Sequence, residues 1–107
     1  MELTQYQVIL VNLDPTVGSE IKKTRPCVII SPDELNGNIR TLTIAPMTTK
    51  THKYPTRILI NQGGQKGYVV LDQIRTIDKQ RVVKSFGKLS IKESSEIKKV
   101  IKEIFVY

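Results

Sequence analysis

The sequence predicts a mainly β protein, in which a small bent sheet or partly open barrel of short strands is covered by one C-terminal helix. Two observations support this prediction. Apolar runs of strand length alternate with polar or proline-containing turns through the first two thirds of the chain. Only the tail has its apolar residues at helical spacing.

The length and composition indicate one compact unit. The chain has 107 residues, which is near the commonest size for a domain, and its 39% hydrophobic and 25% charged residues are ordinary globular proportions. No repeat or linker-like tract divides it. We therefore expect residues 1–107 to form a single domain around one core.

The first two strands are expected at Val8–Leu13 and Cys27–Ile30. Asp14–Pro15 ends the first strand, because proline lacks the N–H that a central strand donates. The second strand follows Pro26, and the segment Asp33–Asn38 after it is expected to be a polar turn.

Four later strands are expected, at Arg40–Ala45, Thr56–Asn61, Gly67–Leu71 and Val82–Phe86. The first of them alternates apolar and polar residues, and Pro46 is expected to close it. The pair Gly63–Gly64 supplies a turn between the second and the third.

The tail has the pattern of an amphipathic helix from Ile91 to about Phe105. Ser90 and Glu93 have the spacing of a capping box, in which each side chain bonds a main-chain N–H of the first turn. The apolar positions at helical spacing are Ile97, Val100, Ile101, Ile104 and Phe105. The other face is basic and carries Lys92, Lys98, Lys99 and Lys102.

The chain is basic, with 17 Lys and Arg against 10 Asp and Glu, a formal charge of +7 and a pI near 9.7. This balance favours encounter with polyanions, and because the apolar runs are too short to cross a membrane, nucleic acid is the expected partner.

Cys27 is the only cysteine, so we expect a buried, inert thiol and no intrachain disulfide. The N-terminus lacks the pattern of a signal peptide, and a cytoplasmic location is therefore expected.

The segment from Asp14 to Pro26 is the first candidate for a functional loop, with a flexible centre, Glu20 and three cations. Composition alone favours a solvated hairpin by roughly two to one. Arg25 is the exception, because the residue before a proline is restrained toward an extended backbone. A guanidinium held in this way offers a planar fork of donors to phosphate oxygens and to the charge that grows on them in phosphoryl transfer.

The second candidate follows Pro46, where Thr48, Thr49 and Lys50 present two hydroxyls and an ammonium group. Either hydroxyl is a possible phosphate donor. An ordinary Ser/Thr turn that caps the strand end is at least as good an interpretation.

The next residues mix cations with two rings, His52, Lys53 and Tyr54, a combination suited to phosphate contacts and to stacking on unpaired bases. His52 is the only histidine, and we interpret it as a binding residue rather than as a general acid or base. No cluster of His, Cys, Asp and Glu has metal-ligand spacing, so we expect neither a metal nor a cofactor.

Six short segments, taken in order, resemble the signature segments of MazF/PemK-type toxin endoribonucleases of type II toxin–antitoxin systems. They are Leu13–Thr16, Gly18–Glu20, Arg25–Pro26, Ala45–Thr48, Leu71–Arg75 and Gly87–Ser90. Each is weak alone, but six in the family's order across nearly the whole chain make coincidence a poor explanation.

The resemblance implies an SH3-like, partly open barrel of five to seven strands that assembles as a homodimer. It also implies sequence-specific, metal-independent cleavage of single-stranded RNA, such as mRNA, tRNA or rRNA. The ribose 2′-hydroxyl would attack the adjacent phosphate and leave a 2′,3′-cyclic phosphate and a 5′-hydroxyl. A small cognate antitoxin would neutralise the enzyme.

The resemblance further implies Arg25 and Thr48 as the principal catalytic residues. Arg25 would neutralise the phosphorane and donate a proton to the leaving oxygen, while Thr48 would orient the phosphate. Glu20 ranks third, as a candidate base whose pKa a neighbouring cation would lower. The expected RNA-binding residues are Thr16, Lys22, Lys23, Thr49, Lys50, His52, Lys53, Tyr54, Asp72 and Gln73.

The chain departs from the family pattern at two places. Some relatives use the aspartate of the Asp-Gln segment with an arginine two residues earlier; Asp72 matches, but Val70 stands at the arginine's position, which favours Arg25 and Thr48. Tyr6–Gln7 replaces the usual Gly-Asp before the first strand.

Two other functions stay open: a toxin of the same fold that poisons DNA gyrase, and a non-catalytic RNA-binding barrel.

Overall fold

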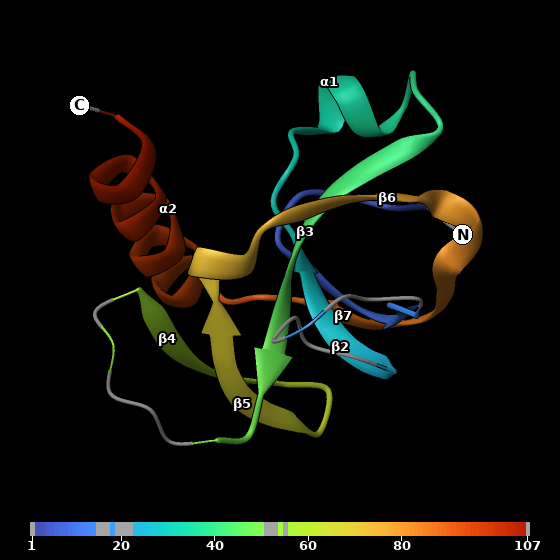
Figure 1. The fold of residues 1–107 in the computed structure, drawn as a ribbon. Helices are drawn as coiled ribbons and strands as arrows, with labels where there is room; N and C mark the ends of the chain where they lie inside the picture. Colours follow the sequence, from blue (N-terminus) through green and yellow to red (C-terminus); the bar gives the residue numbers. More distant parts are fainter. Residues whose placement is uncertain (1, 15–17, 19–22, 51–53, 55, 107) are drawn as a thin grey trace.

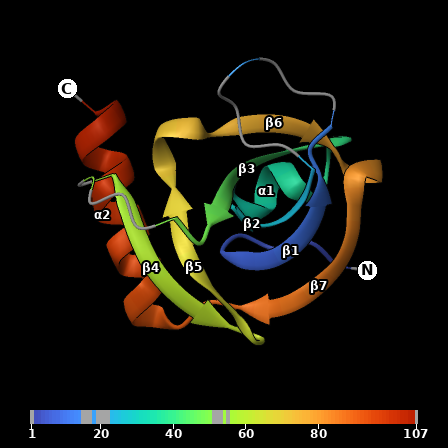
Figure 2. The same cartoon turned by 60° about the horizontal axis from the view of Figure 1, so that its bottom comes forward.

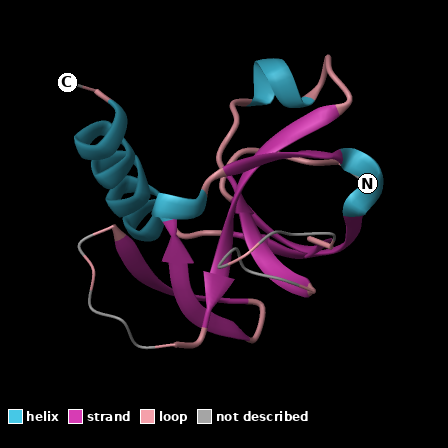
Figure 3. Ribbon diagram, in the orientation of Figure 1, coloured by secondary structure: helices cyan, strands magenta, loops and turns pink. Residues whose placement is uncertain are grey.

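The strands form one curled sheet with a single long helix packed against it (Figure 1). The computed structural model describes residues 2–14, 18, 23–50, 54 and 56–106. In this part of the chain the elements are β1 (Gln7–Asn12), β2 (Thr24–Ile29), α1 (Asp33–Asn36), β3 (Thr41–Thr48), β4 (Arg57–Gln62), β5 (Gln65–Val70), the 3₁₀ turn η1 (Leu71–Gln73), β6 (Arg75–Asp78), the 3₁₀ turn η2 (Lys79–Arg81), β7 (Val82–Lys88) and α2 (Ile91–Phe105). Strands dominate this part, as Figure 3 shows.

Strand β3 joins the two halves of the sheet. The spatial order is β4-β5-β3-β2-β1-β7, with β6 paired to β3 beside this path, and every pair is antiparallel. The first residues of β3, Thr41–Ile44, pair with β6, whereas its last two residues pair with β5. The end of β3 at Thr48 therefore lies between β2 and β5 (Figure 2).

The two ends of the strand order come close to each other at the turn between β4 and β5. Gly63 and Gly64 have φ values of 60° and 79°, as a two-residue hairpin turn of type I′ requires. A Cβ at Gly63 would lie only 2.4 Å from the carbonyl oxygen of Phe86 in β7. The predicted small, partly open barrel, mainly β with a C-terminal helix, is confirmed.

Central strands are buried on both faces of the sheet, which explains why β1 and β2 have continuous apolar runs. On one face Val8 and Val28 pack in a cluster with Ile97 of α2. On the other face Ile9 packs in a second cluster with Ile77 of β6.

Helix α2 begins as the sequence predicts. The Ser90 hydroxyl accepts a hydrogen bond from the Glu93 N–H (3.1 Å), and the Glu93 carboxylate accepts one from the Ser90 N–H (3.1 Å), which completes the capping box. Ile97 is fully buried against the sheet, whereas Ile104 and Phe105 in the last turn are 36% and 60% exposed.

The prediction that Pro46 closes a strand is wrong, because Pro46 lies inside β3, as Pro26 lies inside β2. Each proline pairs with only one of the two neighbouring strands, Pro26 with β1 and Pro46 with β2. Pro26 pairs with Leu10 of β1, before the β2–β3 ladder begins at Cys27; Pro46 pairs with Cys27, before the β3–β5 ladder begins. A strand tolerates proline where the missing N–H costs no ladder hydrogen bond.

Two other elements differ from the prediction. The expected polar turn at Asp33–Asn38 contains the short helix α1, and the buried Asn36 side chain satisfies its polar groups by exchanging hydrogen bonds with Ser31 (2.6 and 2.8 Å). Strand β6 was not predicted, since only Ile77 of its four residues is buried and no apolar run marks it.

Candidate functional site

Arg25 and Thr48 come from neighbouring strands and line the same hollow. Strands β2 and β3 pair from Ile29–Ile44 to Cys27–Pro46, and Arg25 and Thr48 each lie two residues beyond this last pair. The fold thus brings together the two strongest candidates, with Arg25 exposed and Thr48 half-buried.

The Thr48 hydroxyl forms the Ser/Thr turn that was one of the two interpretations of this segment. It accepts a hydrogen bond from the Lys50 N–H at 3.2 Å. This bond uses a lone pair and leaves the hydroxyl proton for another acceptor. The turn therefore orients Thr48 and does not prevent it from donating to a phosphate oxygen.

A hollow of about 200 Å³ lies at these two side chains. It is lined by Arg25, Pro26, Met47, Thr48, Thr49, Gln65, Lys66 and Gly67. No acidic residue is among these described lining residues, and two of them, Arg25 and Lys66, are cationic. Gly67 permits the close approach of β5, because a Cβ at this position would lie 2.9 Å from the carbonyl oxygen of Thr48.

A second hollow of about 390 Å³ adjoins the first and shares three lining residues with it. It is lined by Thr49, Leu59, Lys66, Gly67 and Tyr68. Sequence reasoning missed Leu59, Lys66 and Tyr68, as it missed Gln65 in the first hollow. These residues reach the site only because β5 pairs with β3 as well as with β4, and no sequence pattern predicts that pairing.

The base of the loop between β1 and β2 is held from two sides. Lys23, with φ 68°, donates its N–H to the Asp14 carboxylate (2.9 Å), and its carbonyl oxygen accepts from the Leu13 N–H (3.0 Å). From the other side, Arg75 donates to the carbonyl oxygen of Leu13 (3.3 Å) and Arg81 donates to that of Asp14. The Lys23 side chain is exposed at this base.

Asp72 belongs to a separate cluster with Thr56, Arg57 and Tyr54. Its carboxylate accepts a hydrogen bond from the Thr56 hydroxyl (2.9 Å) and pairs with Arg57 (3.5 Å), whose guanidinium lies over the exposed Tyr54 ring at 4.8 Å. Partial burial would raise the pKa of Asp72, but the hydrogen bonds from Arg57 and Thr56 outweigh burial and lower it. This cluster, and half-buried Gln73 on η1, line neither hollow.

The remaining predicted residues divide into two groups. Thr49 lines both hollows, and Lys50 is exposed two residues after the end of β3. The others, Thr16, Glu20, Lys22, His52 and Lys53, lie outside the described residues.

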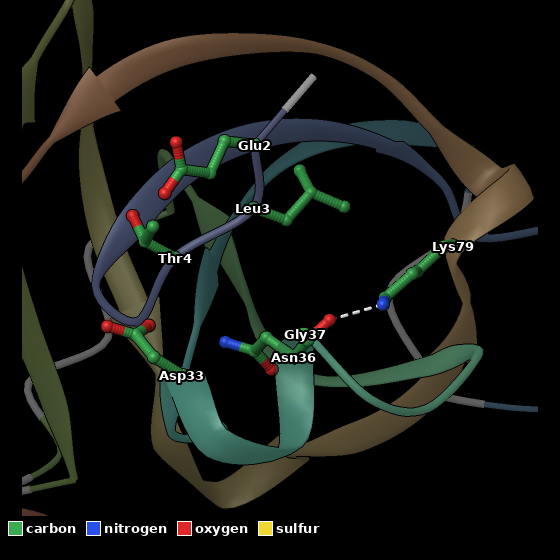
Figure 4. A pocket seen from close by; sticks show the side chains of 7 residues that line it. All are labelled: Glu2, Leu3, Thr4, Asp33, Asn36, Gly37 and Lys79. Carbon is green, nitrogen blue, oxygen red and sulfur yellow. Dashed lines mark hydrogen bonds between the residues drawn. The ribbon is translucent and has the colours of Figure 1, made fainter.

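A third hollow, of about 310 Å³, lies beside α1 and the N-terminal segment (Figure 4). Two of its charged side chains are bonded within the chain: Lys79 donates to the carbonyl oxygen of Asn36, and Asp33 accepts from the Gln5 N–H at 2.7 Å. The hollow therefore needs no ligand to satisfy these groups.

Cys27 is buried, as predicted, and burial raises the pKa of its thiol to about 12 against the opposing charge of Arg75. Among the described residues, no three or more His, Cys, Asp or Glu side chains gather where they could hold a metal ion. Over the same part of the chain, neither helix combines the length and the apolar character needed to cross a membrane.

Fold and site define a small curled β protein that carries a cationic, hydroxyl-bearing hollow suited to phosphate. The chain belongs to the PemK-like, MazF-like toxin family of type II toxin–antitoxin systems, whose model matches residues 4–105. The resemblance carried by the six sequence segments is therefore confirmed.

Two named endoribonucleases are similar to this chain over most of its length. The chain is 35% identical over 100 residues to the endoribonuclease MazF of Staphylococcus saprophyticus, covering 88% of this chain and 83% of that protein. It is 31% identical over 103 residues to the endoribonuclease MazF9 of Mycobacterium tuberculosis, covering 86% of each.

Solved structures confirm the fold. MazF from Deinococcus radiodurans has a TM-score of 0.89 at 20% identity, covering 100% of this chain and 99% of that one. An endoribonuclease in complex with its cognate antitoxin, from a mycobacterial species, has a TM-score of 0.81 at 19% identity, covering 94% and 92%.

Proposed function

We propose that this protein is a sequence-specific endoribonuclease toxin that cleaves single-stranded RNA without a metal ion and is neutralised by a cognate antitoxin. The observation that carries the proposal is that Arg25 of β2 and Thr48 of the neighbouring strand β3 line one hollow. Family membership supports it, because relatives over most of the chain are named endoribonucleases and a structure of the same fold holds a cognate antitoxin.

In the proposed reaction the ribose 2′-oxygen attacks the adjacent phosphorus, and the bond from phosphorus to the 5′-oxygen of the next nucleotide breaks. The products are a 2′,3′-cyclic phosphate and a 5′-hydroxyl. Negative charge grows on the phosphate oxygens in the transition state, where the Arg25 guanidinium stabilises it and the Thr48 hydroxyl donates a hydrogen bond. A fixed guanidinium supplies this stabilisation without a metal.

The 2′-hydroxyl proton passes to a general base, and the leaving 5′-oxygen takes up a proton. Asp72 is a poor base, since its carboxylate is bonded to Arg57 and Thr56 and its pKa is lowered. Arg25 is also a poor base, because a guanidinium carries only donors and has no lone pair available to accept a proton. These arguments favour Glu20 as the base and leave Arg25 to donate to the leaving oxygen.

We extend the proposal to assembly and location on the strength of the family: the toxin is a homodimer and acts in the cytoplasm, where its RNA substrates are. Light scattering coupled to size-exclusion chromatography would test the dimer. A monomeric mass at micromolar concentration would contradict it.

The test of the nuclease is cleavage of a mixed single-stranded RNA pool in excess EDTA, followed by sequencing of the 5′-hydroxyl ends. Arg25→Ala is expected to slow cleavage roughly 10²-fold or more, the effect of removing a transition-state donor. Arg40→Ala is the matched control, because Arg40 is exposed just before β3, at the end of the strand remote from Thr48.

Three results would contradict the proposal. Normal cleavage by folded Arg25→Ala would remove Arg25 from the mechanism, and activity that requires an added divalent ion would overturn metal independence. Inhibition of DNA gyrase by a wild-type protein that leaves every RNA intact would assign the chain to the gyrase-poisoning alternative.

A further inference from the structure

Four side chains from four neighbouring strands form one row across the sheet. Thr48 of β3 pairs with Tyr68 of β5, and Tyr68 pairs with Leu59 of β4. On the other side of β3 lies β2, whose Arg25 lines the same hollow as Thr48. Because opposite residues share a face, the hydroxyl, the aromatic ring and the aliphatic side chain follow one another at strand spacings of about 4.8 Å, with the cation of Arg25 beside the hydroxyl.

The row lies on the face of the sheet that α2 does not cover. Side chains alternate along a strand, and Ile58, Ile60 and Val69 pack in one buried cluster with Ile97 of α2. Figure 2 shows α2 beside β4 and β5. The intervening residues of these strands, among them Leu59, which is 49% exposed, therefore project away from the helix.

Both hollows of the candidate site open along this row. The Arg25–Thr48 hollow and the Tyr68–Leu59 hollow share Thr49, Lys66 and Gly67, so they adjoin each other. One end offers positive charge and a hydroxyl, and the other offers an aromatic ring and an exposed aliphatic surface. This is the chemistry that binds an unpaired nucleotide, with the phosphate on cations and the base on a ring.

We propose that the Tyr68–Leu59 hollow is a nucleobase subsite for the nucleotide next to the scissile phosphate. The base stacks on the Tyr68 ring and contacts Leu59, while Lys66, which lines both hollows, binds the phosphate between them. The subsite rests on the proposed function, because Arg25 and Thr48 set where the phosphate lies. It restricts the substrate to single strands, since a paired base is already stacked within its duplex.

The test is binding of two fluorescent probes that the enzyme cannot cut by attack of a 2′-hydroxyl. The first is a single-stranded 2′-fluoro RNA pool of mixed sequence, and the second is an abasic sugar–phosphate chain of the same length. Tyr68→Ala is expected to weaken binding of the RNA pool about tenfold and to leave the abasic chain unchanged. Tyr68→Phe keeps the ring and should bind both probes as the wild type does.

Two further variants separate the contacts to the base from those to the phosphate. Leu59→Ser is expected to weaken only the RNA pool, whereas Lys66→Met should weaken both probes. Val83→Ser is the control for Leu59→Ser, because Val83 is 56% exposed on β7, outside the row. Thermal unfolding of each variant checks the fold, and Tyr68→Leu replaces Tyr68→Ala if the smaller residue destabilises β5.

Equal losses for the two probes in folded Tyr68→Ala or Tyr68→Leu, or no loss for the RNA pool, would overturn the subsite. Neither probe reports cleavage, so the result is independent of the nuclease assay. If the wild type cuts no RNA but Tyr68→Ala still loses binding only of the RNA pool, the proposed function is contradicted and the subsite is supported.

Discussion

The guanidinium of Arg81 donates a hydrogen bond to the main-chain carbonyl oxygen of Asn12 (3.2 Å), 69 residues earlier in the chain. Arg81 donates a second hydrogen bond to the carbonyl oxygen of Asp14, and Arg75 donates one to the carbonyl oxygen of Leu13 (3.3 Å). The held segment is the end of β1, whose ladder with β2 includes Arg25. Charge-assisted bonds of this kind restrain the end of β1, where Val11 pairs with Arg25 of β2.

Loss of Arg81 is therefore expected to slow RNA cleavage through Arg25 rather than through the general stability of the fold. We predict that Arg81→Met lowers the cleavage rate about tenfold, and that it has little effect when Arg25 is already alanine, because coupled residues are not additive. A double-mutant cycle of single-turnover rates measures this coupling. Additive losses in the cycle would show that Arg81 acts independently of Arg25.

The turn between β4 and β5 provides a test of how the curled sheet closes. At Gly63 a Cβ would lie 2.4 Å from the Phe86 carbonyl oxygen, whereas Gly64, also with positive φ, has open space around it. Gly64→Ala is expected to cost about 1 kcal/mol for the left-handed backbone alone. Gly63→Ala should cost about 3 kcal/mol or more, since the added methyl also displaces β7. Similar free energies of unfolding for the two variants would contradict this contact.

Much of the fold was predictable because its signals are local. The type I′ turn at Gly63–Gly64 and the capping box of Ser90 and Glu93 depend on residues adjacent or three apart. The prolines were misread for the opposite reason. Whether Pro46 ends a strand or lies inside it depends on which neighbour pairs at that residue, and pairing partners far apart in the chain leave no local pattern.

The candidate site also contains residues that local sequence identifies and residues that only strand pairing reveals. Arg25 and Thr48 are recognisable because each adjoins a proline-marked strand and matches a family segment. Tyr68 and Leu59 look like ordinary strand residues, and only the registers of β5 with β3 and β4 align them with Thr48. Asp72 matches a family segment too, but sequence does not reveal its bonds to Arg57 and Thr56.

The Cys27 thiol provides a chemical probe of the core. Burial raises its pKa to about 12, although the charge of Arg75 opposes this, and the thiolate is the reactive form. We predict that iodoacetamide at pH 8 leaves the folded protein unmodified and alkylates it fully in denaturant, as mass spectrometry would show. Rapid modification of the native protein at that pH would contradict the burial of Cys27.

The Glu93 carboxylate joins the start of α2 to the sheet and titrates abnormally as a result. It accepts hydrogen bonds from the Asn61 N–H of β4 (2.9 Å) and from both the N–H and the hydroxyl of Ser90 (3.1 and 2.9 Å). Partial burial would raise the pKa of Glu93, but these hydrogen bonds outweigh burial and lower the pKa below the ordinary glutamate value.

A group whose pKa is lowered by folding stabilises the folded state above its unfolded pKa, and this contribution is lost as pH falls through the folded pKa. We therefore predict that the wild type loses stability between pH 5 and pH 3 partly through Glu93, and that Glu93→Gln shows a smaller loss over this range. Glu96→Gln is the matched control, because Glu96 is exposed on the same helix. Urea unfolding at several pH values measures the difference, and identical pH dependence in both variants would show that the bonds of Glu93 to Asn61 and Ser90 do not stabilise the fold.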